Sequence, residues 1–140
     1  PAAMDQAIDI YRENFKPSEQ LEKPHVMLGY NVCAADSPEE ADLLRSSSLQ
    51  SFVNMRKGTA GKLPPPIANF EATLSSPEQQ MLHQMARCAA VGNADMVEDQ
   101  IKRFVKETEA DELIIASSIF DHEARLHSYE LTAEVAGRIN

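Results

Sequence analysis

The sequence has no apolar run approaching the length of a membrane-spanning helix, and it is poor in basic residues. A transmembrane helix needs about 20 consecutive apolar residues, so the sequence predicts no such helix. The 13 lysines and arginines are outnumbered by 22 acidic residues, which gives a formal net charge of −9. This charge argues against a nucleic-acid binder, because such a protein needs a basic surface to displace counterions from phosphates.

The sequence also contains only two cysteines, Cys33 and Cys88, which lie far apart and lack the short spacing of a metal-binding pair. A disulfide framework is therefore excluded as the basis of the fold. We expect two reduced thiols, no metal site and a cytoplasmic location. At 140 residues the chain is long enough for one domain with a core of its own.

The clearest structural pattern is a helix–strand–helix unit in the last third of the chain. The apolar run Leu113–Ala116 lacks alternation, which predicts a strand buried on both faces. Before it, the apolar residues of the segment after Asn93 recur at helical spacing, with Asn93 as the N-cap. After it, we expect Asp121 to cap a final helix. The predicted apolar side of this final helix consists of Leu126, Tyr129 and Ala133.

A second strand is expected at Pro24–Ala35, and the two strands are expected to pair in parallel. The remaining segments predict helices at Ala3–Phe15, from Ser37 to about Arg56, and from Ser76 to Ala90. Ser37-Pro38-Glu39-Glu40 has the composition of a capped helix start. The sequence thus predicts an α/β fold with two parallel strands and surrounding helices. The glycines and prolines between 58 and 74 predict a long irregular loop.

Polar residues stand where both predicted strands end, which is where α/β proteins usually bind ligands. Asn31 interrupts the first strand near its carboxyl end, and Ser117 and Ser118 follow the second. Arg125 in the next helix can bring positive charge towards an anionic ligand. The alternative interpretation is a capped, solvated helix start with Arg125 in a surface ion pair.

Two other sites are disfavoured by spacing. His122 and His127 are five positions apart, about 140° around a helix, so they cannot share a metal ion as histidines four apart do. Asp121 and His122 next to two serines contain the residue types of a hydrolase triad. No nucleophile-elbow pattern accompanies them, and near neighbours in sequence rarely form a triad.

Several segments in order resemble the C-terminal part of the bacterial luciferase-like flavin-dependent monooxygenases. They are Tyr11–Ser18, His25–Gly29, Ala34–Asp36, Leu63–Pro66, Val91-Gly92, Ala110–Ile114 and Tyr129–Leu131. The family often has Gly-Ser-Pro-Glu or Gly-Thr-Pro-Glu where this chain has Gly92–Asp95, which still supplies a cap and an acid. The resemblance implies a fragment of a TIM (β/α)8 barrel, which needs about 250 residues when complete. We expect residues 1–140 to form one partial domain, with a helical and loop insertion at about 37–90.

The resemblance further implies a monooxygenase that uses reduced FMN, molecular oxygen and an organic substrate. Asn31, Ser117, Ser118 and Arg125 are then the expected flavin-binding residues, with the loop around Pro64–Pro66 as a cover. The catalytic residues are not identified. The isolated chain is expected to be inactive and to form a homodimer or a higher symmetric homo-oligomer. A non-catalytic flavoprotein-like or self-associating module and a deazaflavin-dependent oxidoreductase remain the alternatives.

Overall fold

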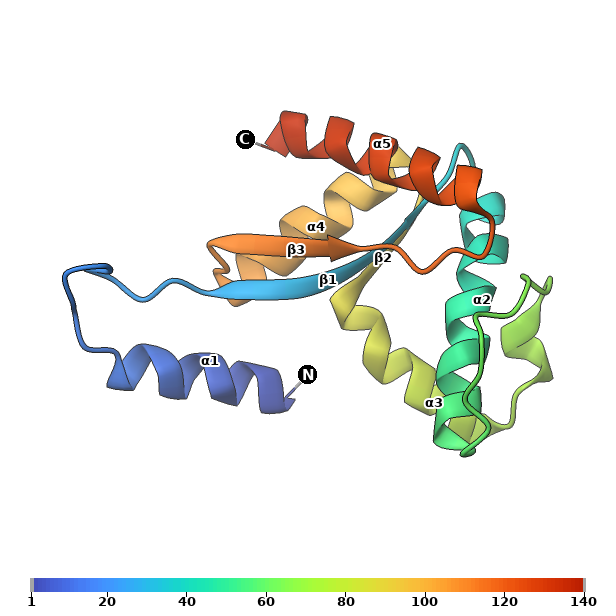
Figure 1. Cartoon of the computed structure of the whole chain (residues 1–140), viewed down its shortest axis with the longest axis horizontal. Helices are drawn as coiled ribbons and strands as arrows, with labels where there is room; N and C mark the ends of the chain where they lie inside the picture. The colour runs from blue at the N-terminus through green and yellow to red at the C-terminus, as the bar shows by residue number, and fades with distance from the viewer. Residues whose placement is uncertain (1, 140) are drawn as a thin grey trace.

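The computed structural model describes residues 2–139 and shows a small parallel sheet with helices around it (Figure 1). The α/β class is confirmed. None of the helices in the described range is long and apolar enough to cross a membrane. The elements are α1 (Ala2–Asn14), β1 (Met27–Ala34), α2 (Pro38–Arg56), α3 (Ser76–Met85), β2 (Ala89–Gly92), α4 (Ala94–Thr108), β3 (Glu112–Ala116) and α5 (His122–Ile139), with 3-10 turns η1 (Phe70–Thr73) and η2 (Ala86–Cys88).

The sheet has three strands in the order β2-β1-β3, all parallel. β1 and β3 pair from Met27↔Glu112 to Asn31↔Ala116, which confirms the predicted parallel pair. The prediction of only two strands is wrong, because β2 pairs with the carboxyl half of β1. The sequence predicted helix as far as Ala90, whereas α3 ends at Met85. A run as short as Ala89–Gly92 carries little strand signal, and its pairing with β1 decides its conformation.

A glutamine side chain closes the outer edge of β2. The Val91 N–H donates to Oε1 of Gln100 at 3.3 Å, and Nε2 of Gln100 donates to the Val91 carbonyl at 2.9 Å. The amide therefore occupies the backbone groups that a further strand would use. Unpaired edges are sites of unwanted association, so this contact terminates the sheet on one side. Within residues 2–139, the outer edge of β3 has no strand partner.

The core lies between one face of the sheet and helices α4 and α5. Tyr30 and Phe104 pack with ring centroids 4.5 Å apart, and Val97 and Val135 are fully buried beside them. The opposite face of β1 and β3 is open, with Ile114 56% and Met27 47% exposed. The prediction that Leu113–Ala116 is buried on both faces is therefore wrong for this chain.

If the chain is cut from a barrel, the sequence predicts that Val26, Leu28, Leu113 and Ile115 are among the side chains left bare, but these are not the exposed ones. Val26 is buried, and Leu28, Leu113 and Ile115 are half-buried on the helix-covered face. The exposed side chains are their neighbours along each strand, Met27 and Ile114, because successive side chains of a strand point to opposite faces.

The buried side of α5 is not the predicted one. Leu126 and Tyr129 are 44% and 40% exposed, and Ala133 is exposed. The buried residues are Ser128, Thr132 and Val135. Small hydroxyl side chains can be buried here because each finds a hydrogen-bond partner: Ser128 Oγ accepts the Ala34 N–H, and Thr132 Oγ1 donates to the Ser128 carbonyl.

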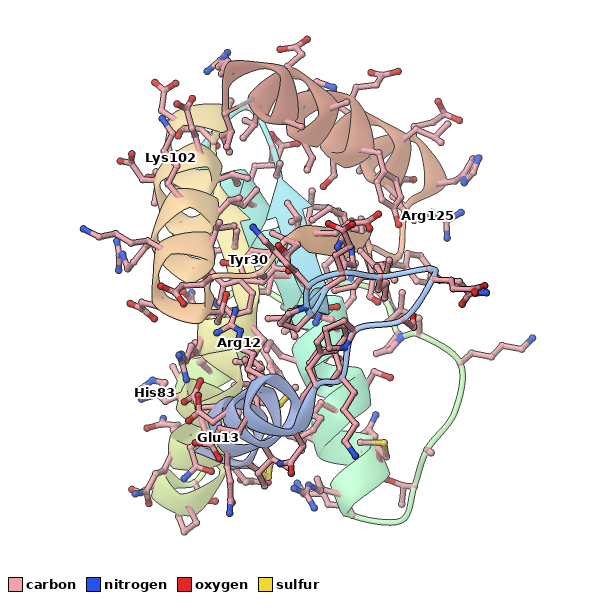
Figure 2. The ribbon with its side chains drawn as sticks, turned by 90° about the vertical axis from the view of Figure 1, so that its left-hand side faces the viewer. Arg12, Glu13, Tyr30, His83, Lys102 and Arg125 are labelled. Carbon is pink, nitrogen blue, oxygen red and sulfur yellow. The ribbon has the colours of Figure 1, made fainter. Side chains whose placement is uncertain are left out.

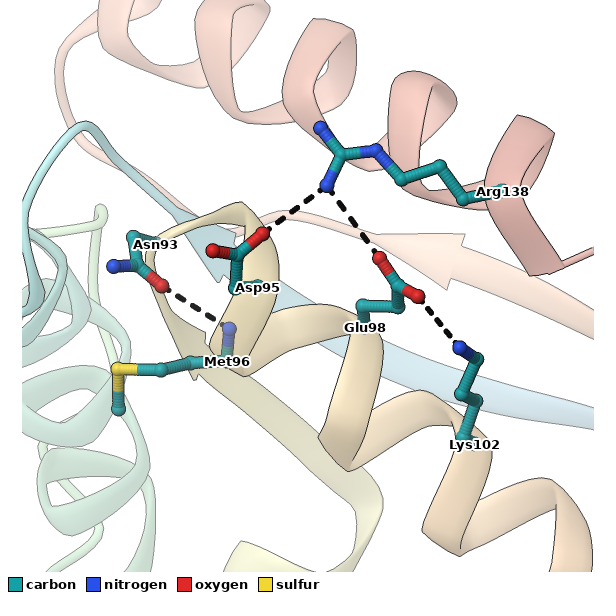
Figure 3. Close-up of polar contacts among 6 residues, drawn as sticks. All are labelled: Asn93, Asp95, Met96, Glu98, Lys102 and Arg138. Carbon is teal, nitrogen blue, oxygen red and sulfur yellow. Dashed lines mark hydrogen bonds and ion pairs between the residues drawn. The ribbon is translucent and has the colours of Figure 1, made fainter.

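The helix starts agree with their predicted caps. Ser37 Oγ accepts the Glu40 N–H at 3.2 Å, and Asp121 Oδ1 accepts the Ala124 N–H at 2.9 Å. Asn93 Oδ1 accepts the Met96 N–H at 3.1 Å (Figure 3). The backbone is in the left-handed region at Gly92, where φ is +141°. Glycine suits this position because it has no Cβ.

An ion-pair network joins the end of α5 to the start of α4 (Figure 3). Arg138 Nη1 lies 3.2 Å from Asp95 Oδ1 and 3.4 Å from Glu98 Oε2. Lys102 Nζ lies 2.6 Å from the other oxygen of Glu98. These cations hold the pKa of Glu98 below its ordinary value, Lys102 contributing most. The network holds α5 alongside α4 and over the core.

Candidate functional site

A cavity of about 590 Å³ lies at the carboxyl ends of β1 and β2. Helices α2 and α3 and the first part of α4 form its walls, and the segment after β3 contributes one residue. The lining residues are Asn31, Val32, Cys33, Pro38, Asp42, Arg45, Ser48, Leu49, Phe52, Leu82, Met85, Ala86, Ala89, Ala90, Val91, Gly92, Met96, Asp99, Gln100, Arg103 and Ser118. The cavity is thus where α/β folds usually place their chemistry.

Two of the four predicted binding residues meet in this cavity. Asn31 comes from β1 and Ser118 from the segment after β3, and both line it. Their approach follows from the register, because Asn31 pairs with Ala116, two residues before Ser118. An amide-bearing and a hydroxyl-bearing residue therefore line the same cavity at one end of the sheet.

The other two predicted residues do not line the cavity. Ser117 turns towards α5, where its N–H donates to the Tyr129 hydroxyl at 3.0 Å and its Oγ donates to Ser128 Oγ at 3.4 Å. Arg125 donates to Nδ1 of His122 at 2.8 Å. Figure 2 shows Arg125 well away from His83 of α3, the helix that forms one wall of the cavity.

Sequence reasoning missed the wall contributed by α2. Its lining residues recur at helical spacing along one face of the helix. They are Pro38, Asp42, Arg45, Ser48, Leu49 and Phe52. This spacing is visible in the sequence, but only the tertiary structure shows that the face turns towards β2. The cavity therefore combines aromatic and aliphatic side chains with two acidic and two basic residues, which are Asp42 and Arg45 on α2 and Asp99 and Arg103 on α4.

The α2–α3 region is held by ion pairs next to the cavity. Arg45, which is 22% exposed, pairs with Glu71 of η1. Lys57 Nζ lies 2.8 Å from Glu78 of α3. Hydrogen bonds from Lys57 and then from Ser75 lower the pKa of Glu78 to about 2. These contacts anchor η1 and α3 to α2 and so fix one side of the cavity.

Cys33 contributes a neutral thiol to the lining. Burial raises the pKa of this thiol to about 12, and its Sγ donates to the Ala41 carbonyl at 3.3 Å. Because the thiolate is the reactive form of cysteine, Cys33 is unsuited to nucleophilic chemistry at neutral pH. Its place in the site is that of a small packing residue.

The loop around Pro64–Pro66 does not cover the cavity. It runs along α2, where Gln50 Nε2 donates to the Pro65 carbonyl at 2.9 Å and the Ile67 N–H donates to Ser46 Oγ at 2.8 Å. None of residues 58–74 lines the cavity. The wall formed by α3 contributes Leu82 and Met85 instead. Of the residues weighed for a triad, Asp121 caps α5 and His122 accepts a hydrogen bond from Arg125.

The chain is similar to known proteins in both sequence and structure. No family model matches the chain. Two proteins named luciferase-like monooxygenase, from Escherichia coli strains K12 and O6:H1, are each 44% identical over 135 residues, which is 96% of this chain and 40% of theirs. The uncharacterized Bacillus subtilis protein YvbT is 35% identical over 96% of this chain and 40% of its own length.

The fold also matches a solved structure. The crystal structure of apo-MsnO8 superposes with a TM-score of 0.80 at 30% identity, over 95% of this chain and 41% of that one. The chain thus spans about 40% of the length of the curated relatives it matches.

Proposed function

We propose that this chain forms one side of the flavin and substrate site of a luciferase-like monooxygenase. The premise is that the chain is homologous to part of these enzymes. Luciferase-like monooxygenases are generally flavin-dependent. The single observation that carries the proposal is the meeting of Asn31 and Ser118 in one cavity at the carboxyl ends of the strands. FMN is the proposed flavin, and an organic compound is the proposed substrate.

We further propose that the fold is part of a (β/α)8 barrel. β1 and β3 are parallel neighbours with α4 directly before β3, as expected for successive strands of such a barrel. β2 pairs only with the carboxyl half of β1 and follows the segment 37–90, so we assign it to the end of an insertion on that face. The open face that bears Ile114 would then turn towards the barrel interior.

The residues in the cavity fit the ring system of a flavin. The Asn31 amide and the Ser118 hydroxyl offer donors and acceptors to a ring edge, and Phe52, Leu82 and Met85 offer apolar surface to its faces. Bound in its reduced form, a flavin supplies the electrons that activate dioxygen. In this proposal Asn31 and Ser118 orient the ring, while the apolar wall of α2 and α3 keeps water away.

The cavity favours recognition of a ring over recognition of a phosphate group. Of its two lining arginines, Arg45 is already paired with Glu71, and the carboxylates of Asp42 and Asp99 in the lining oppose an anion. A phosphate needs several charge-assisted hydrogen bonds, and Arg103 alone is left in the lining to offer them. We therefore assign only ring recognition to this chain, and we expect the 140-residue chain alone to be inactive.

The activity prediction is tested by mixing the purified chain with reduced FMN, oxygen and a long-chain aldehyde. No light and no carboxylic acid product should appear. Either signal at stoichiometric yield would show that the chain alone contains a complete catalytic site.

Flavin binding can be mapped with the methionines as internal probes. Illuminated flavin oxidises nearby thioethers, and Met85 and Met96 line the cavity with 39% and 42% of their surface exposed. Met55 and Met27 lie outside the cavity and are more exposed, at 55% and 47%. Bound FMN should therefore oxidise Met85 and Met96 first, as read by peptide mass spectrometry. If the methionines are instead oxidised in the order of their exposure, with Met55 first, the result would count against FMN binding in the cavity.

Two substitutions test the same site through its affinity for FMN. Asn31→Ala and Ser118→Ala should each weaken FMN binding by about 0.5–1.5 kcal/mol, the value of one neutral hydrogen bond. Ser76→Ala, on the exposed side of α3, is the matched control and should change nothing. A parallel titration with a deazaflavin tests the alternative cofactor. Unchanged affinity in both cavity variants would remove these residues from the site.

A further inference from the structure

Three consecutive residues of α5 contact the carboxyl ends of β1 and β3. Ser128 is fully buried, and its Oγ accepts the Ala34 N–H at 2.9 Å and the Ser117 hydroxyl at 3.4 Å. The Tyr129 hydroxyl accepts the Ser117 N–H at 3.0 Å. Ala34 ends β1 and Ser117 follows β3, so one turn of helix fixes both strand ends.

The preceding residue extends this contact to the segment after β1. His127 Nε2 lies 2.8 Å from Asp36 Oδ1, and His127 Nδ1 lies 3.8 Å from Glu130 Oε2 on the same helix. Asp36 lies between β1 and α2, the helix that forms a cavity wall. The segment that leads from β1 into α2 is thereby attached to the same turn of α5.

We propose that His127, Ser128 and Tyr129 form a clamp that positions Asn31 and Ser118 relative to each other. The inference deepens the proposed function and rests on it, because it assigns positioning residues to the same site. None of the three lines the cavity. Each holds part of the backbone next to the cavity. Ser128 holds the ends of β1 and β3, Tyr129 holds the end of β3, and His127 holds the segment between β1 and α2.

The chemistry of the clamp differs from that of ordinary helix packing. The buried face of α5 places a hydroxyl group, rather than an apolar side chain, against the end of β1. That hydroxyl satisfies the N–H of Ala34, which is only 1% exposed and would otherwise lack a partner in the sheet. Replacing Ser128 by alanine leaves this N–H unsatisfied, so the end of β1 must shift or take up water.

The outer part of the clamp depends on pH. Hydrogen bonding to Asp36, and less strongly to Glu130, raises the pKa of His127 above its ordinary value of 6.5. These are the charged groups that face the imidazole, one from the segment after β1 and one from α5. Because the pKa is higher in the folded state, the ion pair is complete below pH 6.5 and is lost as pH rises through the folded pKa. The clamp is therefore tighter at low pH.

The test uses the whole chain and two independent readouts. The first is the pair of NMR signals from the Asn31 side-chain amide and the Ser118 backbone amide, and the second is the affinity for FMN. Ser128→Ala and Tyr129→Phe should shift both signals and weaken FMN binding by about two- to tenfold, as expected for one lost hydrogen bond. In the wild type the Asn31 signal should change between about pH 6 and 8, where histidine titrates, because His127 contacts the segment that follows β1. His127→Gln should abolish this change. Asp36→Asn should reduce that change in the same way.

Thr132→Val is the matched control, because it removes a buried hydroxyl from the same helix without touching a strand end. It should lower stability and leave the Asn31 and Ser118 signals in place. A wild-type chain that binds no FMN, but whose variants shift these signals, would refute the proposed function and support the clamp. Unchanged signals in Ser128→Ala and Tyr129→Phe, or the same shift in Thr132→Val, would overturn the clamp.

Discussion

The backbone conformation at Gly92 leads to a direct prediction about the stability of the chain. Gly92 ends β2 with φ at +141°, and its carbonyl accepts the Ala35 N–H at 3.1 Å. A Cβ built there would lie 2.8 Å from Met96 Cβ and 2.9 Å from Met96 Sδ. The perturbation is Gly92→Ala, which adds one methyl group at the point where β2, α4 and the cavity meet.

The expected cost has two parts. Backbone strain at a φ that side chains rarely adopt costs about 1–3 kcal/mol, and an extra methyl group in a packed site costs about 1–3 kcal/mol. The reduced freedom of the unfolded chain returns about 0.4–1 kcal/mol. We expect a net loss of about 1–6 kcal/mol, which lowers the melting temperature by roughly 3–4 °C per kcal/mol in a chain of this size.

The assay is urea unfolding followed by circular dichroism, with Gly137→Ala as the matched control. Gly137 lies within α5, and an added Cβ there meets nothing within 4 Å. Gly137→Ala should stabilise the chain by about 0.5–1 kcal/mol, since alanine is the better helix former. Gly92→Ala/Met96→Ala should recover only part of the loss, because the Cβ of residue 96 remains in place. A Gly92→Ala variant within 0.5 kcal/mol of the wild type, a threshold of about the size of ordinary surface effects, would refute the reasoning.

Three further outcomes are expected. Ser37→Ala should lower stability by about 0.5–2 kcal/mol, because the Ser37 hydroxyl caps α2, and an unmoved melting curve would contradict this. The pKa of Glu78 is lowered to about 2, so its contribution should be present above pH 4.5 and be lost as pH falls towards 2; acid unfolding curves that stay the same in Glu78→Gln would rule this out. We propose that copies associate into a homodimer or a higher symmetric oligomer through the open edge of β3 and the exposed Ile114 beside it. Light scattering at micromolar concentration should then exceed 15.5 kDa and fall towards it in Ile114→Lys, whereas a folded wild-type monomer would disprove association.

The sequence alone determined the elements whose signals are local. Proline and capping residues fixed the starts of α2, α3, α4 and α5, because a cap is made within one helical turn. Apolar runs located β1 and β3, and the alternation of helices and strands gave the α/β class and the parallel pair. Asn31 and Ser118 were placed at strand ends by the same logic, and the register then brought them together.

Only the tertiary structure decided the features that depend on contacts distant in sequence. β2 exists because β1 and the Gln100 amide satisfy its backbone on both sides. The open face of the sheet is set by which side α4 and α5 cover, and an unbroken apolar run cannot encode that choice. Ser117 points to α5 rather than to the cavity because Ser128 and Tyr129 offer it partners 11 and 12 residues later. Hydrogen bonds of this kind arise only once the helix has packed on the strands, so the sequence pattern of either element alone does not contain them.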